Sequence, residues 1–441
     1  MITNTKNSEN LYIKSTKFLA GGVNGDIKFR DPYPLFFSKA NGPYIWDIDN
    51  NKYIDYNLSY GALILGHGHP VVKRAILDTL NNTGTILFGN PSPLEVEFAE
   101  LLLSIYMKDG LIRLTNSGQE ATLLAIRLAK AYTEKEKVGK FDGHYHGANP
   151  FLLSNHRPNL NSSKKGNINK EPDSFEIKGK ILDDIVILPF NNIEKTKEIL
   201  DENKDLAAII LEPFEDGYIP AKREFISFLR KYTLENNIVL IFDEVKTGFR
   251  IRIGGAVEYY NIVPDIICLG KIIGGGAPAG AVIGKEDIMN LLDPRKKEKH
   301  VFHSGTFNGN PLTMSLGLAT IKELLSNGNF NYLQSISTEL KNKISNLLSE
   351  YNIEHRIYGE GGIVNFTLGN KEILTYRDFS IENLIERKKI DLNLLKYGLY
   401  VIPGSRYSLS IAHKKEDIEE TLNLFRVVIE SYVRDNKKSR Y

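Results

Sequence analysis

The chain has 441 residues, of which 42% are hydrophobic and 25% are charged, and its formal net charge is +2. This length predicts two domains, or one large and one small, and the near-neutral charge gives no support for nucleic-acid binding through a basic surface. The single cysteine, Cys268, excludes intrachain disulfides, and no apolar stretch is long enough to cross a bilayer. Because the first residues lack the apolar region of a signal peptide, we expect a cytoplasmic protein with no membrane partner.

The first hundred residues predict a hairpin followed by helices. Residues 35–56 read as a hairpin, because 44–49 and 52–56 alternate between apolar and polar side chains around an Asn-Asn turn. Residues 71–80 and 94–103 place apolar side chains at helical spacing.

From residue 111 onward, strands alternate with helices. Helices are predicted over 120–132 and 222–235, and apolar strands over 111–115, 138–141, 206–212, 238–243, 266–269 and 279–284. Continuously apolar strands separated by helices favour a mostly parallel sheet covered on both faces. In such sheets, ligands bind at the carboxyl ends of the strands, so the residues just after each strand are the candidates for function.

A polar segment and a change of pattern divide the rest of the chain. Residues 155–180 predict a long surface loop, which can serve as a lid or as plain surface decoration. After residue 318 the pattern changes to helices over 319–325 and 332–351 and to short strands near 362–367 and 407–411. We therefore predict an α/β protein with an N-terminal segment over 1–65 that joins the small domain, a large domain over 66–318 and a small α+β domain over 319–441.

The most informative strand end carries Lys271. An apolar strand stops at Gly270, the lysine follows, and three glycines occupy 274–276. Burying an unpaired ammonium is costly, so a lysine between two core strands predicts an amine presented in a cavity, where a depressed pKa would make it a nucleophile toward carbonyls. The alternative is an ordinary exit from strand to loop.

Two other strand ends add an anion site and a carboxylate. Ser117, Gly118 and Gln119 open a helix, where free N–H groups and the helix dipole favour an anion, although Ser117 can also be a simple N-cap. Asp243 ends the apolar strand over 238–243 and can orient a cation or a protonated ring nitrogen. We predict no metal site, because the histidine pairs at 67 and 69 and at 144 and 146 lie in glycine-flanked loops and make weak ligand pairs.

Two loops complete the set. Tyr145 follows the strand over 138–141 and can stack on a planar ligand, and residues 303–311 form a polar, glycine-rich loop that can contact a phosphate. An amine, an anion cradle, a carboxylate and an aromatic face together suit one cofactor, pyridoxal 5′-phosphate.

Motifs over nearly the whole chain resemble the class III (omega-type) aminotransferases. Within that class they are most similar to the glutamate-1-semialdehyde aminomutase group. The matching stretches run in family order and are 21–24 (GGVN), 46–50 (WDIDN), 65–70 (LGHGHP), 116–121 (NSGQEA), 141–147 (FDGHYHG), 242–250 (FDEVKTGFR), 269–276 (LGKIIGGG) and 304–311 (SGTFNGNP).

The resemblance implies a fold and a role for each matching residue. It implies a pyridoxal-phosphate transferase of fold type I that works as a homodimer with shared active sites. Lys271 would carry the cofactor and shuttle the proton, and Asp243 would pair with the ring nitrogen. The remaining cofactor contacts would be the phosphate ligands Ser117, Gly118 and Gln119, the ring-covering residues Val245 and Tyr145, and Thr306, which would reach the phosphate of the neighbouring subunit.

The chain departs from the aminomutase pattern where substrate would bind. Lys28 stands where the aminomutase has an arginine, with Arg30 two residues later, and only arginine offers a planar fork to a carboxylate. The stretch over 401–413 is shorter than in the aminomutase, lacks its glutamate and contains Arg406. We therefore predict substrate binding by Lys28, Arg30 and Arg406.

These departures favour an aminotransferase that moves an amino group from an amino acid donor to a small carbonyl acceptor. The aminomutase reaction, which makes 5-aminolevulinate, is the alternative. A decarboxylase or racemase on the same fold also remains open, as does a cofactor-binding protein without catalysis, which the presence of Lys271 and Asp243 disfavours.

Overall fold

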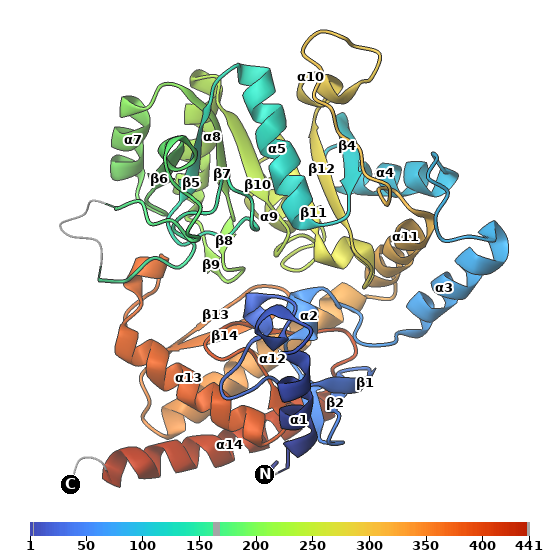
Figure 1. Ribbon diagram of the computed structural model, residues 1–441. Helices are drawn as coiled ribbons and strands as arrows, with labels where there is room; N and C mark the ends of the chain where they lie inside the picture. Colours follow the sequence, from blue (N-terminus) through green and yellow to red (C-terminus); the bar gives the residue numbers. More distant parts are fainter. Residues whose placement is uncertain (3, 162–167, 439–441) are drawn as a thin grey trace.

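The protein, seen in a computed structural model that describes residues 1–2, 4–161 and 168–438, folds into two lobes (Figure 1). The upper lobe in Figure 1 is built around a seven-stranded sheet, and the lower lobe contains both ends of the chain. Among the described residues, no helix is both long and apolar enough to span a membrane.

The large sheet is mostly parallel, as the sequence predicts. Its strands lie in the order β4 (Gly110–Thr115), β12 (Gly280–Lys285), β11 (Ile266–Gly270), β10 (Val239–Asp243), β7 (Leu206–Leu211), β5 (Lys137–Phe141) and β6 (Ile185–Leu188). β12 pairs antiparallel with both β4 and β11, whereas β11, β10, β7, β5 and β6 pair in parallel. The carboxyl ends of β11, β10, β7 and β5 therefore meet at one edge of the sheet.

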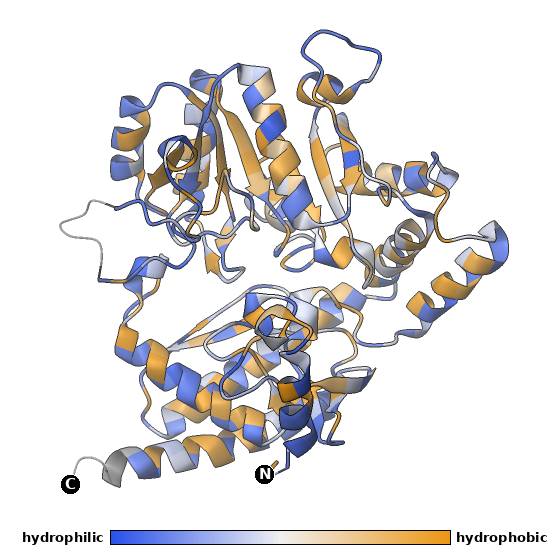
Figure 2. Ribbon diagram, in the orientation of Figure 1, coloured by the Kyte–Doolittle hydropathy of each residue, from blue (hydrophilic) through white to orange (hydrophobic). Residues whose placement is uncertain are grey.

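Helices cover both faces of this sheet, because its strands bury every second side chain on each face. On one face, Leu124 and Leu128 of α5 (Gly118–Thr133) join the same apolar cluster as Ile241 of β10. On the other face, Phe225 of α8 (Arg223–Glu235) joins the cluster of Phe242. Figure 2 shows the central strands β7 and β10 as mostly hydrophobic, whereas β4 includes a hydrophilic residue.

The second lobe combines the C-terminal third of the chain with its N-terminal strands. Its strands form two small sheets, one of β13 (His355–Tyr358), β14 (Ile363–Leu368) and β16 (Tyr407–Ser408), and one of β1 (Phe37–Asn41), β2 (Tyr44–Asp47), β3 (Lys52–Asp55) and β15 (Leu399–Tyr400). The parallel pairing of β15 with β3 joins the two ends of the chain. The longer helices of this lobe are α12 (Asn329–Glu350), α13 (Ile381–Lys396) and α14 (Lys415–Lys438).

The remaining elements connect these layers. They are α1 (Lys6–Ser15), α2 (Leu58–Gly61), α3 (Pro70–Thr83), α4 (Pro93–Tyr106), α6 (Lys180–Asp183), α7 (Ile193–Glu202), α9 (Gly255–Tyr260), α10 (Glu286–Met289), α11 (Pro311–Leu325) and the short strands β8 (Phe214–Glu215) and β9 (Ile219–Pro220). The predicted domain boundary at 318–319 falls inside α11, whose N-terminal part the sequence pattern missed. The three-part division of the chain stays a prediction.

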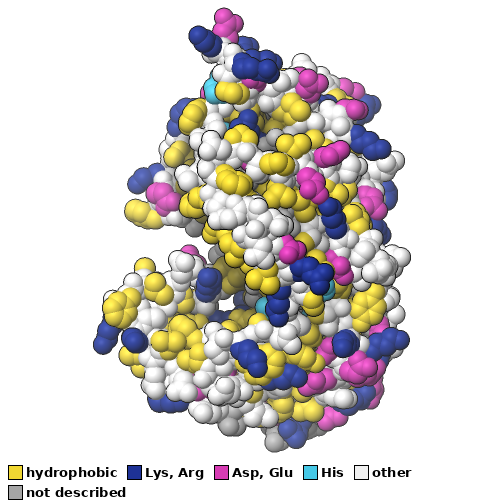
Figure 3. All heavy atoms as spheres, turned by 90° about the vertical axis from the view of Figure 1, so that its right-hand side faces the viewer, with side chains coloured by type: hydrophobic (Ala, Val, Ile, Leu, Met, Phe, Trp, Pro, Cys, Tyr) yellow, Lys and Arg dark blue, Asp and Glu magenta, His cyan; other side chains and the backbone are white. Residues whose placement is uncertain are grey.

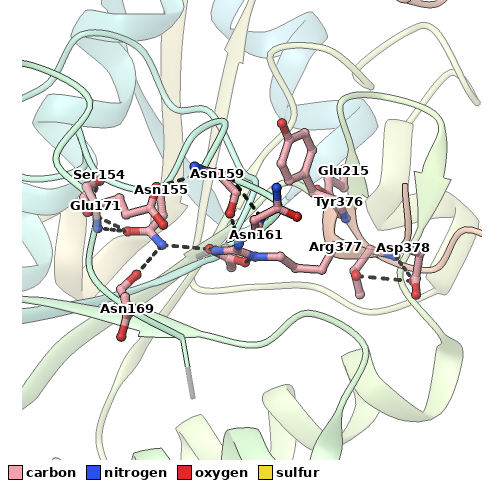
Figure 4. A network of polar contacts seen from close by, with 12 residues as sticks. Ser154, Asn155, Asn159, Asn161, Asn169, Glu171, Glu215, Tyr376, Arg377 and Asp378 are labelled. Atoms are coloured by element: carbon pink, nitrogen blue, oxygen red, sulfur yellow. Dashed lines mark hydrogen bonds and ion pairs between the residues drawn. The ribbon is translucent and has the colours of Figure 1, made fainter. Parts of the chain in front are cut away.

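The predicted loop over 155–180 is anchored to both lobes in its described parts, while residues 162–167 lie outside the described residues. The side-chain amide of Asn155 donates to Asp142 Oδ1 and to the carbonyl of Asn169, both at 2.8 Å. Arg377 of the second lobe places its Nε 2.6 Å from Asp142 Oδ2. Its Nη1 donates to the carbonyl of Asn159 at 2.6 Å, and Figure 4 shows these two residues side by side. A function as a lid stays a prediction.

Candidate functional site

A cavity of about 310 Å³ lies at the carboxyl edge of the large sheet. One of its lining residues, Ala62, comes from the N-terminal segment, and the others lie at or near the strand ends that the sequence singles out. These others are Asn116, Ser117, Gly118, Gln119, Thr122, Tyr145, His146, Gly147, Glu212, Asp243, Val245, Lys246, Lys271 and residues 276–279. On the face that Figure 3 shows, the molecule is hollowed between its two lobes.

The first wall of the cavity is the start of α5. Ser117 is the N-cap of this helix, and its hydroxyl accepts from Glu120 N at 3.2 Å, so the predicted cap is present. A Cβ on Gly118 would lie 2.6 Å from Val245 Cγ2, which leaves room only for glycine. Ser117, Gly118 and Gln119 all line the cavity, and the free N–H groups of a helix N-terminus favour an anion there.

The second wall carries the buried carboxylate of Asp243 at the end of β10. Its Oδ1 accepts from Val245 N at 3.1 Å, and its Oδ2 lies 2.8 Å from His146 Nδ1. His146 Nε2 is buried and has no hydrogen-bond partner among the described residues. The sequence analysis treated His146 only as a weak metal ligand and did not predict this pairing. The contact fixes the orientation of the Asp243 carboxylate.

The neighbouring carboxylate, Glu244, has a structural role. Its Oε1 accepts from Ala256 N at 2.6 Å and Val257 N at 2.9 Å, where α9 begins. Burial raises the pKa of Glu244 to about 7 although these hydrogen bonds favour its charged form. Of the two acids, only Asp243 lines the cavity.

One histidine of each pair noted in the sequence has a structural partner. His144 Nδ1 accepts from Glu212 N at 3.0 Å, and His67 Nε2 lies 2.8 Å from Asp55 Oδ2, so both histidines have structural partners. Within the described parts of the chain, no group of three or more His, Cys, Asp or Glu side chains is placed to hold a metal ion.

Lys271 follows the last residue of β11 and lines the cavity between these walls. Its backbone has φ of 50°, an uncommon conformation for a residue with a side chain and one that is often found at functional sites. Burial, followed by the positive charges of Lys246 and Arg406, lowers the pKa of the Lys271 amine to about 7. The site thus holds a largely neutral, nucleophilic amine slightly above neutral pH.

This pKa predicts how the reactivity of Lys271 depends on pH in the ligand-free protein. Because only the neutral amine reacts, acetylation by acetic anhydride should rise through about pH 7 and then level off. Peptide mass mapping measures the rate at each lysine. Exposed Lys180 is the internal control, because its hydrogen bond to Asp184 raises its pKa above 10.5 and its labelling should still rise at pH 10. A Lys271 profile that follows Lys180 would contradict the assignment.

Tyr145 lies on a loop that is fixed from two sides. Its N–H donates to Glu212 Oε2 at 2.9 Å, and its ring stacks near His156 with centroids 4.5 Å apart. Beneath the loop, the buried ammonium of Lys140 donates to the carbonyls of His144 at 2.9 Å, Leu152 at 3.2 Å and Ser154. The loop therefore presents the aromatic ring of Tyr145 to the cavity as a preorganised wall.

A chain of alternating charges extends from the cavity wall. Lys246 Nζ lies 2.7 Å from Glu212 Oε1 and 3.1 Å from Asp216 Oδ1, and Asp216 Oδ1 lies 3.0 Å from Arg406 Nη1. The sequence identifies Arg406 as a substrate candidate but assigns no role to the other three residues. The sequence did contain one signal that could have identified Lys246 as a site residue, which is a charged side chain only three positions after the end of a buried strand.

The other predicted site residues lie outside this cavity. Thr306 lines a separate surface cavity together with residues 87–91, and the loop that carries it touches the site through Asn308, whose Oδ1 accepts from Asn116 Nδ2 at 2.7 Å. Lys28 is exposed, and the Arg30 guanidinium donates to the carbonyl of Val401 at 3.3 Å and lies 5.4 Å from the ring centroid of Tyr400. A single chain therefore does not bring these three residues to the cavity.

Comparison with known proteins assigns nearly the whole chain to one family. The family model described as "Aminotransferase class-III" matches residues 28–428. A glutamate-1-semialdehyde 2,1-aminomutase of Sulfurisphaera tokodaii is 38% identical over 427 residues, which cover 96% of this chain and 99% of the relative. Further curated relatives with 36% to 39% identity carry the same name.

Solved structures share the fold. An omega-transaminase from Sphaerobacter thermophilus superposes with a TM-score of 0.92 at 30% identity, covering 96% of this chain and 97% of that one. A structure described as a transaminase with PLP bound gives a TM-score of 0.89 at 28% identity, covering 99% of this chain and 100% of that one. The predicted α/β fold type I is therefore confirmed.

Proposed function

Because this chain belongs to the class III aminotransferase family, whose cofactor is pyridoxal 5′-phosphate, we propose that it acts as a glutamate-1-semialdehyde 2,1-aminomutase and makes 5-aminolevulinate. The observation that carries this proposal is the similarity over nearly the full length to relatives with this name. The names of these relatives favour the aminomutase reaction. The departures of this sequence from the aminomutase motifs favour instead an aminotransferase with a separate amino donor.

The residues of the cavity fit the cofactor. The first turn of α5, with Ser117, Gly118 and Gln119, supplies N–H groups for the phosphate, and glycine is the only residue that the space at 118 admits. Val245 and Tyr145 would cover the two faces of the cofactor ring. Both line the cavity together with the acid Asp243 and the amine of Lys271. When bound, pyridoxal phosphate supplies an electron-withdrawing ring to the reacting carbon of the substrate.

We assign the chemistry to two side chains. The neutral amine of Lys271 would hold the cofactor covalently, and the same side chain would hold and move the proton at the reacting carbon of the substrate. Asp243, whose Oδ2 lies 2.8 Å from His146 Nδ1, would keep the ring nitrogen of the cofactor protonated.

The direct test is product formation from a single substrate. Purified enzyme loaded with the amine form of the cofactor is incubated with glutamate-1-semialdehyde and no amino donor, and 5-aminolevulinate is measured. We expect many turnovers per enzyme, because the amino group returns to the same carbon skeleton. Product limited to about one equivalent per active site, with further turnover only after a donor is added, would contradict the proposal.

A second candidate is an aminotransferase with a separate donor, and Arg406 favours it. This largely buried cation pairs with Asp216 at 3.0 Å, and Asp216 in turn pairs with Lys246 of the cavity lining. A donor such as glutamate has a second carboxylate that a cation in this position would bind. Donor-dependent turnover in the same assay identifies this reaction.

We also propose that the active unit is a homodimer in which Thr306 completes the site of the partner subunit. Support comes from the position of Thr306, which lies on an exposed loop joined to the cavity through the Asn308–Asn116 hydrogen bond. Exposed apolar side chains on neighbouring surface segments, among them Phe88, Phe302 and Phe307, offer a surface for a second copy.

A further inference from the structure

We infer that Arg250 is a positioning residue for the cavity: it holds a strained turn over residues 58–61, and this turn sets the place of Ala62 in the cavity lining. Arg250 is the last residue of the matching stretch 242–250, and the proposed chemistry gives it no part. This role rests on the proposed function and adds a residue that fixes a wall for the substrate without touching substrate or cofactor.

The four residues of α2 form a left-handed turn. The φ angles of Leu58, Ser59 and Tyr60 are 46°, 53° and 59°, and Gly61 follows with φ of 86°. Consecutive residues with side chains rarely adopt this conformation, because it brings each Cβ too close to the following carbonyl oxygen. The turn is therefore strained, and such strain persists only where the surrounding contacts hold it in place.

This turn leads directly into the cavity lining. Figure 1 shows α2 on the side of the second lobe that faces the large sheet, and the next residue, Ala62, lines the cavity. Leu63 then packs against the glycine run that follows Lys271, because a Cβ on Gly276 would lie 3.2 Å from Leu63 Cδ2. Since the residues assigned to the cofactor lie elsewhere, Ala62 is a wall available to the substrate.

Local side chains fix only the start of the turn. Asp55 Oδ1 accepts the N–H groups of Asn57 at 2.8 Å and Leu58 at 3.0 Å. Asn57 Oδ1 accepts the N–H of Tyr60 at 3.1 Å. The carbonyl of Gly61, at the end of the turn, needs a donor from another part of the chain because Gly61 is buried.

Arg250 supplies that donor and connects the turn to the second lobe. Its Nη2 donates to the carbonyl of Gly61. Its Nη1 donates to the carbonyl of Leu409 at 3.1 Å and lies 3.5 Å from the carbonyl of Gly362. The planar guanidinium thus holds two chain segments in a fixed geometry that the single ammonium of a lysine does not offer.

The burial of this cation is costly. Arg250 is 1% exposed, and the hydrogen bonds of its guanidinium go to backbone carbonyls rather than to an acid. Burial lowers the pKa of Arg250 to about 9. If the space needed only to be filled, an apolar side chain would do so at lower cost, so the contribution of Arg250 lies in its donors.

The test follows hydrogen–deuterium exchange in the cofactor-loaded protein. The N–H groups of Gly61 and Leu63 donate to the carbonyls of Asn57 at 2.8 Å and Leu58 at 3.2 Å, so their exchange reports the turn. In Arg250→Lys, peptides over residues 57–63 should exchange at least about tenfold faster, because a hydrogen bond from a charged group to the turn is lost. Exchange in the strands of the large sheet should stay unchanged.

Kinetics and a rescue variant separate positioning from simple support of the fold. Arg250→Lys should raise KM about tenfold, with a smaller change in kcat and an unchanged cofactor spectrum, because a substrate wall moves while Lys271 and Asp243 stay in place. Adding Ser59→Gly should restore part of the exchange protection and of KM, because glycine adopts φ of 53° without strain. Ser59 is exposed, so this change removes no buried contact.

The control is Arg223→Lys, because Arg223 also donates to two backbone carbonyls, those of Tyr259 at 2.7 Å and Tyr260 at 3.1 Å, outside the cavity lining. It should leave exchange over 57–63 and KM unchanged. Thermal unfolding checks that each variant is folded. If Arg250→Lys does not fold, Gly61→Ala disturbs the same contact from the turn, since its Cβ would lie 3.2 Å from Ser408 Oγ, and it should give the same local increase.

Unchanged exchange over residues 57–63, equally faster exchange throughout the chain, or no restoration by Ser59→Gly would overturn the inference. The exchange experiment needs no turnover, and KM is measured with whichever substrate the donor assay identifies. Failure here and failure of the proposed function are therefore separate results.

Discussion

The Lys271→Ala variant is expected to lose at least about a thousandfold in turnover, since a positioned acid–base group alone contributes roughly 10²–10⁴-fold. In the proposed function the lost amine binds the cofactor covalently and moves the proton, whereas the other amine of the cavity lining, on Lys246, is paired with Glu212 at 2.7 Å. Borohydride reduction should trap no covalent cofactor on the variant, whereas it should trap about one equivalent per chain on the unmodified protein.

Folding of this variant is not at risk, because alanine removes a costly half-buried amine from the cavity. Measured without cofactor, its thermal unfolding temperature should therefore equal or exceed that of the unmodified protein. Retention of a reducible adduct, or a turnover within tenfold of the unmodified enzyme, would show that another amine does this work.

The Asp243→Asn variant should have the second largest effect, a loss of roughly a hundredfold in turnover, because a hydrogen bond to a charged group is replaced by a neutral one. The shape of the side chain is kept, and His146 Nδ1, now 2.8 Å from Asp243 Oδ2, can still bind to position 243. The bound cofactor should show a changed absorption spectrum, because its ring nitrogen loses the carboxylate that keeps it protonated.

Glu244→Gln is the matched control for this variant. Residue 244 is the next carboxylate in the chain, but its oxygens accept the N–H groups of Ala256 and Val257. We expect this control to change thermal stability and to leave the cofactor spectrum unchanged. A spectrum that changes in Glu244→Gln but not in Asp243→Asn would reverse the roles given to the two acids.

Sequence reasoning found the main sheet and the residues that line the cavity at its edge for the same physical reason. Strands buried on both faces are continuously apolar, so a polar residue such as Lys271 or Asp243 stands out at the point where the strand ends. Parallel pairing then brings these ends together, and the cavity lining does contain Ser117, Gly118, Gln119, Tyr145, Asp243, Val245 and Lys271.

The strand order could not be read from the chain. β12 is inserted between β4 and β11 and runs antiparallel to both, although its apolar sequence resembles that of its parallel neighbours. Strand pairing depends on contacts between residues that are distant in sequence, and local periodicity does not reveal those contacts.

The partners of the functional groups were missed for a related reason. His146 and Asp243 are 97 residues apart, and Arg406 and Asp216 are 190 apart, so their pairing exists only in the folded chain. The residues around the substrate were the least predictable: Lys246 lines the cavity but was quoted in a motif without a role, whereas Lys28 and Arg30 lie away from the cavity lining.

The central claim is that one amine among the lysines of this chain carries the cofactor, and peptide mapping tests it directly. The unmodified protein is loaded with pyridoxal phosphate, reduced with borohydride and digested, and the peptide that has gained the pyridoxyl mass is identified. The structure predicts the label on Lys271 alone, in a yield near one per chain. A label on Lys246, or one spread over surface lysines, would contradict the account.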